Sequence, residues 1–127
     1  MSKAITVLVV EDEKMLQDAY RHVLSYKGYD VHVASNGIEG LEQLKKVRPD
    51  IVLLDVLMPQ LGGIGFLKEA KVRQNYPDTR VVACSNLSDA ETREQMLSLG
   101  AERQVLKSDL SPSQLVAMIE ELSPKHA

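Results

Sequence analysis

Three short, nearly continuous apolar runs constrain the fold of this chain more than any other feature of its sequence. They occupy residues 5–10, 51–54 and 81–84. Each run is short and rich in β-branched residues, which is typical of parallel strands covered on both faces. We therefore expect these three segments to be the interior strands of a parallel sheet.

Two weaker segments complete the predicted sheet. Val31-His32-Val33 alternates between apolar and polar residues, which favours an edge strand with one wetter face, and Val105-Leu106 is a second short candidate. Segments with helical periodicity separate the strands. Their apolar positions are Leu16, Ala19, Tyr20, Val23 and Leu24, then Ile38, Leu41 and Leu44, then Phe66, Leu67 and Ala70.

Capping signals mark the last two predicted helices. Ser88-Asp89-Ala90-Glu91 and Ser111-Pro112-Ser113-Gln114 are predicted capping boxes, and the second has proline at the first helical position, where it is favoured. Gly100 stands where the residue after the end of the fourth helix is expected. Strand and helix therefore alternate along the whole chain.

This alternation predicts an α/β fold, a (βα)5 flavodoxin-like doubly wound parallel sheet with strand order 2-1-3-4-5 and helices on both faces. The 127 residues suit a single domain, residues 1–127, with a core over about residues 5–122. Ligands of such sheets bind beyond the carboxyl ends of the strands, near the switch in strand order. The functional site is expected at that edge.

Charge and cysteine content narrow the function classes. The formal net charge is −3 and no long basic run is present, so direct binding to nucleic acid or to an anionic membrane is not expected. The single cysteine, Cys84, excludes an intramolecular disulfide and indicates a reducing compartment. No apolar stretch is long enough to span a bilayer or to form the core of a signal peptide. We expect a cytoplasmic protein.

Polar side chains stand at the carboxyl ends of four of the predicted strands. They are Glu11 and Asp12 after the first, Asp55 at the end of the third, Ser85 at the end of the fourth and Lys107 after the fifth. Three carboxylates in one crevice repel one another unless a cation neutralises them. An oxygen-only cluster favours a hard ion, and Mg²⁺, which keeps waters and takes few carboxylates, fits better than Zn²⁺.

These residue types suit phosphoryl transfer. Asp55 is a carboxylate nucleophile that can form an acyl phosphate. Ser85 offers a hydroxyl donor and Lys107 a cation, and both suit the oxygens of a phosphoryl group, whose transfer depends on positioning and charge neutralisation.

The order and spacing of these residues resemble those of a known family. Glu11-Asp12, Asp55-Val56-Leu57-Met58-Pro59 with Gly63, Ser85 and Lys107 look like the receiver domains of two-component response regulators, and the match runs over about residues 5–122. Each motif alone is weak evidence, but their coincidence at the ends of the first, third, fourth and fifth strands is specific.

The resemblance implies a role for each residue. Asp12 would ligate Mg²⁺ directly, Glu11 would act through water, and Asp55 and the carbonyl of Leu57 would complete the protein ligands. Asp55 would receive its phosphoryl group from the phosphohistidine of a histidine kinase or phosphotransfer protein. Ser85 and Lys107 would hold the phosphoryl oxygens.

The resemblance also implies a chemotaxis-type, stand-alone signalling switch rather than an enzyme. Such a domain is expected to be a monomer or a weak dimer. Its signal would be a change of the surface around the fourth helix, fifth strand and fifth helix, where Arg103 and Gln104 lie and where an unknown downstream protein target would bind.

The sequence departs from the family at several positions. Gln104 stands where the family usually has Tyr or Phe, which puts the usual readout of phosphorylation in doubt but not the chemistry. Ser108 replaces the proline that usually follows the lysine through a cis peptide. A cis bond before a residue other than proline costs about 2.5–4 kcal/mol, so we predict a trans Lys107–Ser108 peptide. Asn86 replaces a smaller residue, and Gly62 replaces an acid.

Two leucines bear on the lifetime of an acyl phosphate. In the family, the residues two beyond the phosphoacceptor and two beyond the Ser/Thr border the path of the hydrolytic water. Here they are Leu57 and Leu87, which cannot hydrogen-bond a water. Slow hydrolysis is therefore predicted.

Three other functions compete with this hypothesis. An aspartyl-phosphate hydrolase of the haloacid-dehalogenase kind would have a second acid where Leu57 stands and would need room for a cap domain. A flavodoxin-like cofactor carrier would need an anion-binding loop after the first strand, where Glu11, Asp12 and Glu13 would repel phosphate. A degenerate receiver that serves as an unphosphorylated scaffold is opposed by the intact site residues and favoured only by Gln104 and Ser108.

Overall fold

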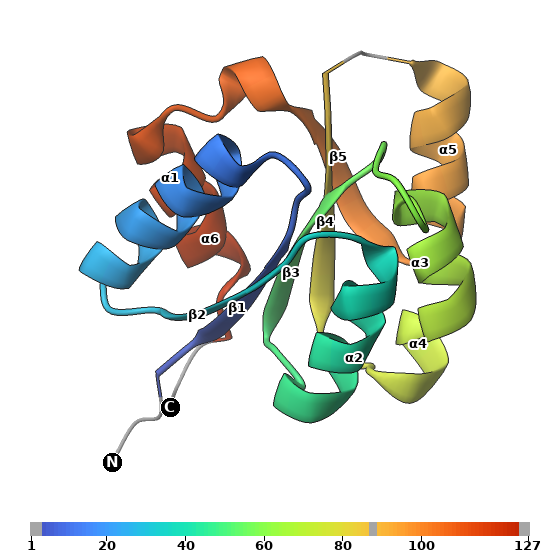
Figure 1. Cartoon of the computed structure of the whole chain (residues 1–127), viewed down its shortest axis with the longest axis horizontal. Helices are drawn as coiled ribbons and strands as arrows, with labels where there is room; N and C mark the ends of the chain where they lie inside the picture. Colours follow the sequence, from blue (N-terminus) through green and yellow to red (C-terminus); the bar gives the residue numbers. More distant parts are fainter. Residues whose placement is uncertain (1–3, 87–88, 125–127) are drawn as a thin grey trace.

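The chain forms a five-stranded parallel sheet with helices on both faces (Figure 1). The computed structural model describes residues 4–86 and 89–124. The strand order is β2-β1-β3-β4-β5, which confirms the predicted topology. The strands are β1 (Thr6–Val10), β2 (Asp30–Ala34), β3 (Ile51–Asp55), β4 (Arg80–Ser85) and β5 (Ala101–Leu106).

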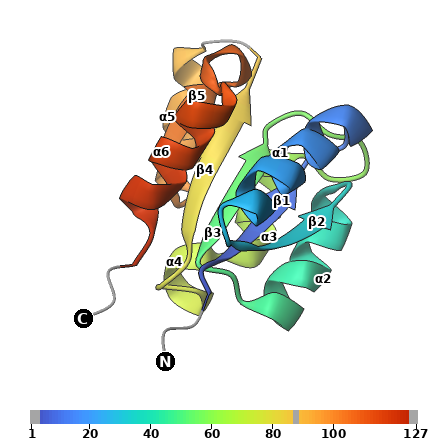
Figure 2. The same cartoon turned by 90° about the vertical axis from the view of Figure 1, so that its left-hand side faces the viewer.

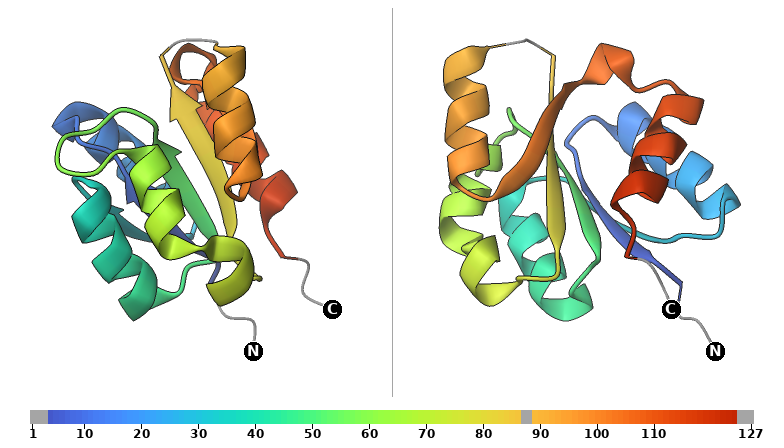
Figure 3. Two further views of the ribbon diagram at one scale, coloured as in Figure 1. Left: turned by 90° about the vertical axis from the view of Figure 1, so that its right-hand side faces the viewer. Right: turned by 180° about the vertical axis from the view of Figure 1, so that it is seen from behind.

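The helices fall into two layers. They are α1 (Lys14–Tyr26), α2 (Gly37–Val47), α3 (Gly63–Ala70), α4 (Val72–Asn75), α5 (Ala90–Ser98) and α6 (Pro112–Leu122), with a 3₁₀ turn η1 (Lys107–Asp109) after β5. Helices α1 and α6 cover one face of the sheet, and α2, α3 and α5 cover the other (Figures 2 and 3).

The interior strands are buried on both faces, as their continuous apolar runs predict. Along β1, Leu8 and Val10 pack in the core beneath α2, α3 and α5, whereas Val7 and Val9 pack in the core beneath α1 and α6. Alternate residues of one strand therefore serve two cores, because successive side chains point to opposite faces. This rigid centre fixes the positions of the strand ends.

The prediction for the last strand was too short. It began at Val105, but β5 begins at Ala101. Glu102 is exposed, and Arg103 and Gln104 are only partly buried, because β5 lies at the edge of the sheet. An edge strand needs no continuous apolar run, so its first half left no apolar signal in the sequence.

Two helix boundaries also differ from the predictions. Lys71 adopts a left-handed conformation with φ of 49°, which ends α3 and makes α4 a separate short helix. Helix α5 has Asp89 as its N-cap, with a side chain that accepts a hydrogen bond from the backbone N–H of Glu91. The predicted N-cap Ser88 lies outside the described residues, and the cap one position later shows that this capping-box prediction was wrong.

The other end signals were correct. Ser111 and Gln114 form the predicted capping box of α6, and Pro112 occupies its first turn. Gly100 follows α5 with φ of 119°, a conformation that residues with a side chain rarely adopt. No cis peptide bond occurs within residues 4–86 and 89–124, so the predicted trans Lys107–Ser108 peptide is confirmed. In the same part of the chain, no helix is long and apolar enough to cross a membrane.

Candidate functional site

The predicted site residues meet at the carboxyl edge of the sheet. Glu11 and Asp12 follow β1, Asp55 ends β3, Ser85 ends β4 and Lys107 opens η1. Because β1 and β3 are neighbours in the sheet, the acidic pair lies beside Asp55. A hollow of about 280 Å³ opens here, lined by Asp12, Glu13, Asp55, Val56, Leu57, Ser85, Asn86 and Lys107.

The three carboxylates are close enough to share a cation. One oxygen each of Glu11, Asp12 and Asp55 lies within 4.8 Å of the others. Glu11 is 2% exposed and Asp55 5% exposed, while Asp12 faces solvent. Burial of several like charges is unfavourable without compensation, and carboxylate oxygens are the ligands that Mg²⁺ prefers. The residues present therefore fit a small divalent cation.

Lys107 supplies a positive charge inside the carboxylate cluster. Its Nζ lies 2.8 Å from Oε1 of Glu11 and 3.2 Å from Oδ2 of Asp55. The side chain is only 6% exposed. Burial by itself lowers the pKa of Lys107, but the hydrogen bond with Glu11 and the charge of Asp55 outweigh it and hold the pKa above its usual value. Lys107 is therefore an ammonium ion that bridges two carboxylates.

The surroundings of Asp55 raise the pKa of its carboxyl group. Burial, and then the charge of Glu11, raise its pKa to about 7, although Lys107 acts in the opposite direction. A bound cation would lower this pKa, because it favours the charged form. An ionised carboxylate at Asp55 is therefore favoured when a cation is bound.

The segment after Asp55 is held by backbone contacts. The backbone N–H of Leu57 donates to Oδ1 of Asp55 at 3.3 Å, and that of Gly63 donates to the carbonyl of Val56 at 2.9 Å. A Cβ at Gly63 would lie 2.7 Å from the carbonyl oxygen of Asp55, so only glycine fits. The Leu57 side chain is 74% exposed.

Ser85 and Gln104 lie on the far strands of the site. Ser85 ends β4 opposite Leu106 and lines the hollow. Gln104 lies beside Ala83, which belongs to the core beneath α2, α3 and α5. The Oε1 atom of Gln104 is buried and has no hydrogen-bond partner in the described part of the chain. Gln104 thus points a polar group where the family usually has an aromatic ring.

Two polar residues next to the site, Gln17 and Asn36, were not predicted. Both are buried. Gln17 shares the buried face of α1 with Tyr20 and Leu24. An amide at a helical position that faces a core was a signal, because buried polar groups need hydrogen-bond partners.

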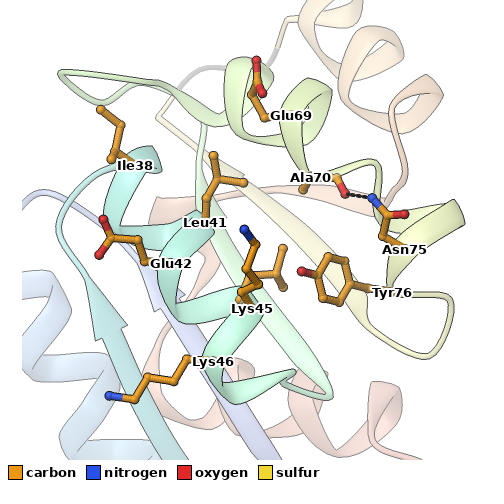
Figure 4. Close-up of a pocket in the computed structure, with 10 residues that line it drawn as sticks. Ile38, Leu41, Glu42, Lys45, Lys46, Glu69, Ala70, Asn75 and Tyr76 are labelled. Carbon is orange, nitrogen blue, oxygen red and sulfur yellow. Dashed lines mark hydrogen bonds between the residues drawn. The ribbon is translucent and has the colours of Figure 1, made fainter.

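A second hollow, of about 680 Å³, lies on the flank of the molecule between α2 and the α3–α4 pair (Figure 4). Its lining mixes apolar side chains such as Leu41 with Lys45 and Glu69. Two of its lining residues also contact Arg48, whose guanidinium lies 4.8 Å from the ring centre of Tyr76 and donates to the carbonyl of Asn75 at 3.3 Å. None of Glu11, Asp12 and Asp55 lines this groove, so the smaller hollow at the strand ends is the candidate functional site.

Comparison with known proteins agrees with this geometry. The model of the response regulator receiver domain family matches residues 7–120. The chain is 29% identical to the chemotaxis protein CheY of Thermotoga maritima, over 92% of this chain and 96% of that protein. Its structure is similar to that of the chemotaxis protein CheY4 of Vibrio cholerae, with a TM-score of 0.87 and 26% identity over 94% of this chain and 99% of that one.

Longer relatives match over one part only. The chain is 36% identical to the probable C4-dicarboxylate response regulator DctR of Priestia megaterium, over 83% of this chain but 46% of that protein. It therefore spans about half the length of this relative. From the family match, the relatives and the fold together, we conclude that the chain belongs to the response regulator receiver domain family of two-component signalling.

Proposed function

We propose that this receiver domain accepts a phosphoryl group on Asp55. The observation that carries the proposal is Lys107, buried between Glu11 and Asp55 in a cluster of three carboxylates. An oxygen of Asp55 attacks the phosphorus of a donor phosphohistidine, the P–N bond breaks, and the donor imidazole leaves. The product is an acyl phosphate on Asp55. Incubation with a small phosphodonor, followed by intact-mass measurement, tests the proposal.

The other site residues position and neutralise the transferred group. When bound, Mg²⁺ would supply charge neutralisation for the phosphoryl oxygens. Asp12, Asp55 and the carbonyl of Leu57 would hold it, and Glu11 would act through water. Lys107 can turn from the carboxylates toward a phosphoryl oxygen because its Nζ already lies beside Asp55. The hydroxyl of Ser85 lines the same hollow and would donate to another oxygen.

The proposed partners follow from this chemistry. A histidine kinase or phosphotransfer protein would supply the phosphoryl group. A downstream protein would bind the surface of α5, β5 and α6, where Arg103 pairs with Glu121 at 2.8 Å. We propose that the domain does not contact nucleic acid or a membrane directly, that it is cytoplasmic, and that it is a monomer or a weak dimer.

Gln104 supports a second candidate, a receiver that serves as a scaffold and does not respond to phosphorylation. Its buried Oε1 has no partner in the part of the chain that the structure describes, and the usual aromatic ring is missing. Amide exchange before and after phosphorylation distinguishes the two functions. A scaffold would keep the same surface at α5, β5 and α6 when Asp55 is loaded, whereas a switch would change its amide exchange there.

We expect Mg²⁺ to bind with a millimolar dissociation constant, because the carboxylates need a cation but Mg²⁺ keeps several of its waters. The largest amide shifts in an NMR titration should be those of residues next to Asp12 and Asp55. Asp12→Asn, which removes one exposed carboxylate, should weaken binding. Unchanged amides at tens of millimolar would exclude the proposed metal site.

We expect the acyl phosphate to persist for minutes or longer after the donor is removed. Hydrolysis needs a water held in line with the phosphorus, and Leu57 offers no group to hold one. Leu87, the other leucine predicted to border the path of the water, lies outside the described residues. The double variant Leu57→Asn, Leu87→Glu should speed decay about tenfold or more, since a positioned proton acceptor accelerates such steps. Decay of the parent within seconds, or an unchanged rate in the variant, would contradict this account.

A further inference from the structure

Gln17 joins two loops at the carboxyl edge of the sheet. Its side chain is 4% exposed on the inner face of α1. The Nε2 atom lies 3.0 Å from the carbonyl oxygen of Glu11, 3.3 Å from that of Ala34 and 3.3 Å from Oγ of Ser35. One buried amide thus links the loop after β1, which carries the acidic pair, to the loop after β2.

These bonds restrain Glu11 at both of its backbone polar groups. Its N–H donates to the carbonyl of Ala34 at 3.0 Å, and its carbonyl accepts from Gln17. Its Oε2 accepts from the backbone N–H of Glu13 at 3.1 Å. The carboxylates of the site repel one another, so the loop that carries Glu11 would move away from Asp55 if it were held only at its ends. The bond from Gln17 opposes that movement.

A second set of contacts joins the loop after β2 to the segment after Asp55. Asn36 is buried, and its Nδ2 donates to Oε1 of Gln60 at 3.2 Å. The backbone N–H of Gly37 donates to the carbonyl of Leu61 at 2.9 Å. A Cβ on Gly37 would lie 2.3 Å from that carbonyl oxygen, so the two backbones touch. Polar contacts therefore run from Glu11 through Gln17 and Asn36 to the loop that begins at Asp55.

We propose that Gln17 is a positioning residue that sets the acidic pair for cation binding and, through the loop after β2, couples it to the loop that follows Asp55. The inference deepens the proposed function, because it concerns the same cation site. Within the part of the chain that the structure describes, the three hydrogen bonds of the Gln17 side-chain amide go to the loops at the site and none goes to α1. A side chain needed only for packing would be apolar, since a buried amide is unfavourable unless it is hydrogen-bonded.

Gln17→Met tests the role, because methionine has a similar length and no donor. We expect the Mg²⁺ dissociation constant, measured from amide shifts, to rise about tenfold, the lower end of the loss seen when a partner of a metal ligand is removed. In the metal-free protein, the amide hydrogen of Glu11 should exchange faster than in the parent. Leu24→Val is the control, because Leu24 is buried on the same helix beyond Gln17. It should lower Tm without changing the dissociation constant.

Gln60→Ala tests the other end of the contacts. Gln60 is exposed, so the Gln60→Ala variant should keep its fold. Its Mg²⁺ dissociation constant should rise about threefold, less than when a direct contact of the acidic pair is lost. Unchanged Mg²⁺ affinity in Gln17→Met overturns the positioning role. If Gln17→Met does not fold, unchanged affinity in Gln60→Ala overturns the inference. A parent protein that binds no Mg²⁺ would instead refute the proposed function, while faster exchange at Glu11 in Gln17→Met would still show that Gln17 holds the loop.

Discussion

Asp55→Asn is expected to gain no phosphoryl group from acetyl phosphate under conditions in which the parent protein gains one. The amide is not a competent nucleophile, and the isosteric change keeps the shape of a buried residue at the end of β3. Intact-mass measurement gives the result directly. Asp78→Asn is the control, because Asp78 is an exposed acid outside the site hollow. A phosphoryl group on Asp55→Asn would place the nucleophile elsewhere.

The same variant should be more stable than the parent when EDTA removes metal. The raised pKa of Asp55, about 7 against 3.8, means that the folded state holds a proton that the unfolded state releases between these values. The stability of the parent therefore falls as pH rises from about 4 to 7. Asparagine removes this cost, so the gain should grow over that range to about 1–3 kcal/mol at pH 8. Urea unfolding at several pH values measures it.

Lys107→Met should destabilise the metal-free protein near neutral pH by about 3 kcal/mol. The change leaves Glu11 and Asp55 buried without the cation that bridges them at 2.8 and 3.2 Å. The same change should tighten Mg²⁺ binding, because the ammonium no longer competes for the carboxylates. Addition of Mg²⁺ should therefore restore much of the lost stability.

Urea unfolding with EDTA and with Mg²⁺ tests both parts of this prediction. Lys14→Met is the matched control. Lys14 pairs with Asp18 on the exposed surface of α1, so its loss should change stability by less than about 1 kcal/mol. A Lys107→Met protein that is as stable as the parent without metal, or that binds Mg²⁺ no better, would show that Lys107 does not compensate the carboxylate cluster.

The interior strands gave the clearest signal in the sequence because most of their residues are buried. The interior strands β1, β3 and β4 are buried on both faces over most of their length, so their central positions are apolar and the signal is nearly continuous. β5 has one open edge, and its polar first half, from Glu102 to Gln104, was missed for that reason. The left-handed Lys71 gives no local warning, because lysine is neither glycine nor asparagine.

The candidate site was predictable because each residue stands at the end of a strand. Parallel strands bring their carboxyl ends to one edge, so Glu11, Asp12, Asp55, Ser85 and Lys107 were expected together, and the structure places them together. Their roles as phosphoacceptor, metal ligands and hydrogen-bond donors to the phosphoryl oxygens stay predictions. The direct pairing of Lys107 with Glu11, and the bonds from Gln17, depend on distances between loops that the sequence pattern does not contain.

The central claim is that Asp55 carries the phosphoryl group. Its most direct test is to phosphorylate the parent protein with acetyl phosphate and Mg²⁺, reduce the acyl phosphate with borohydride, and locate the product by digestion and tandem mass spectrometry. Reduction converts a phosphorylated aspartate to homoserine. We predict homoserine at position 55 alone, in amounts that fall when EDTA replaces Mg²⁺. Phosphate on Ser85 or on a histidine, or no modified peptide at all, would contradict the account.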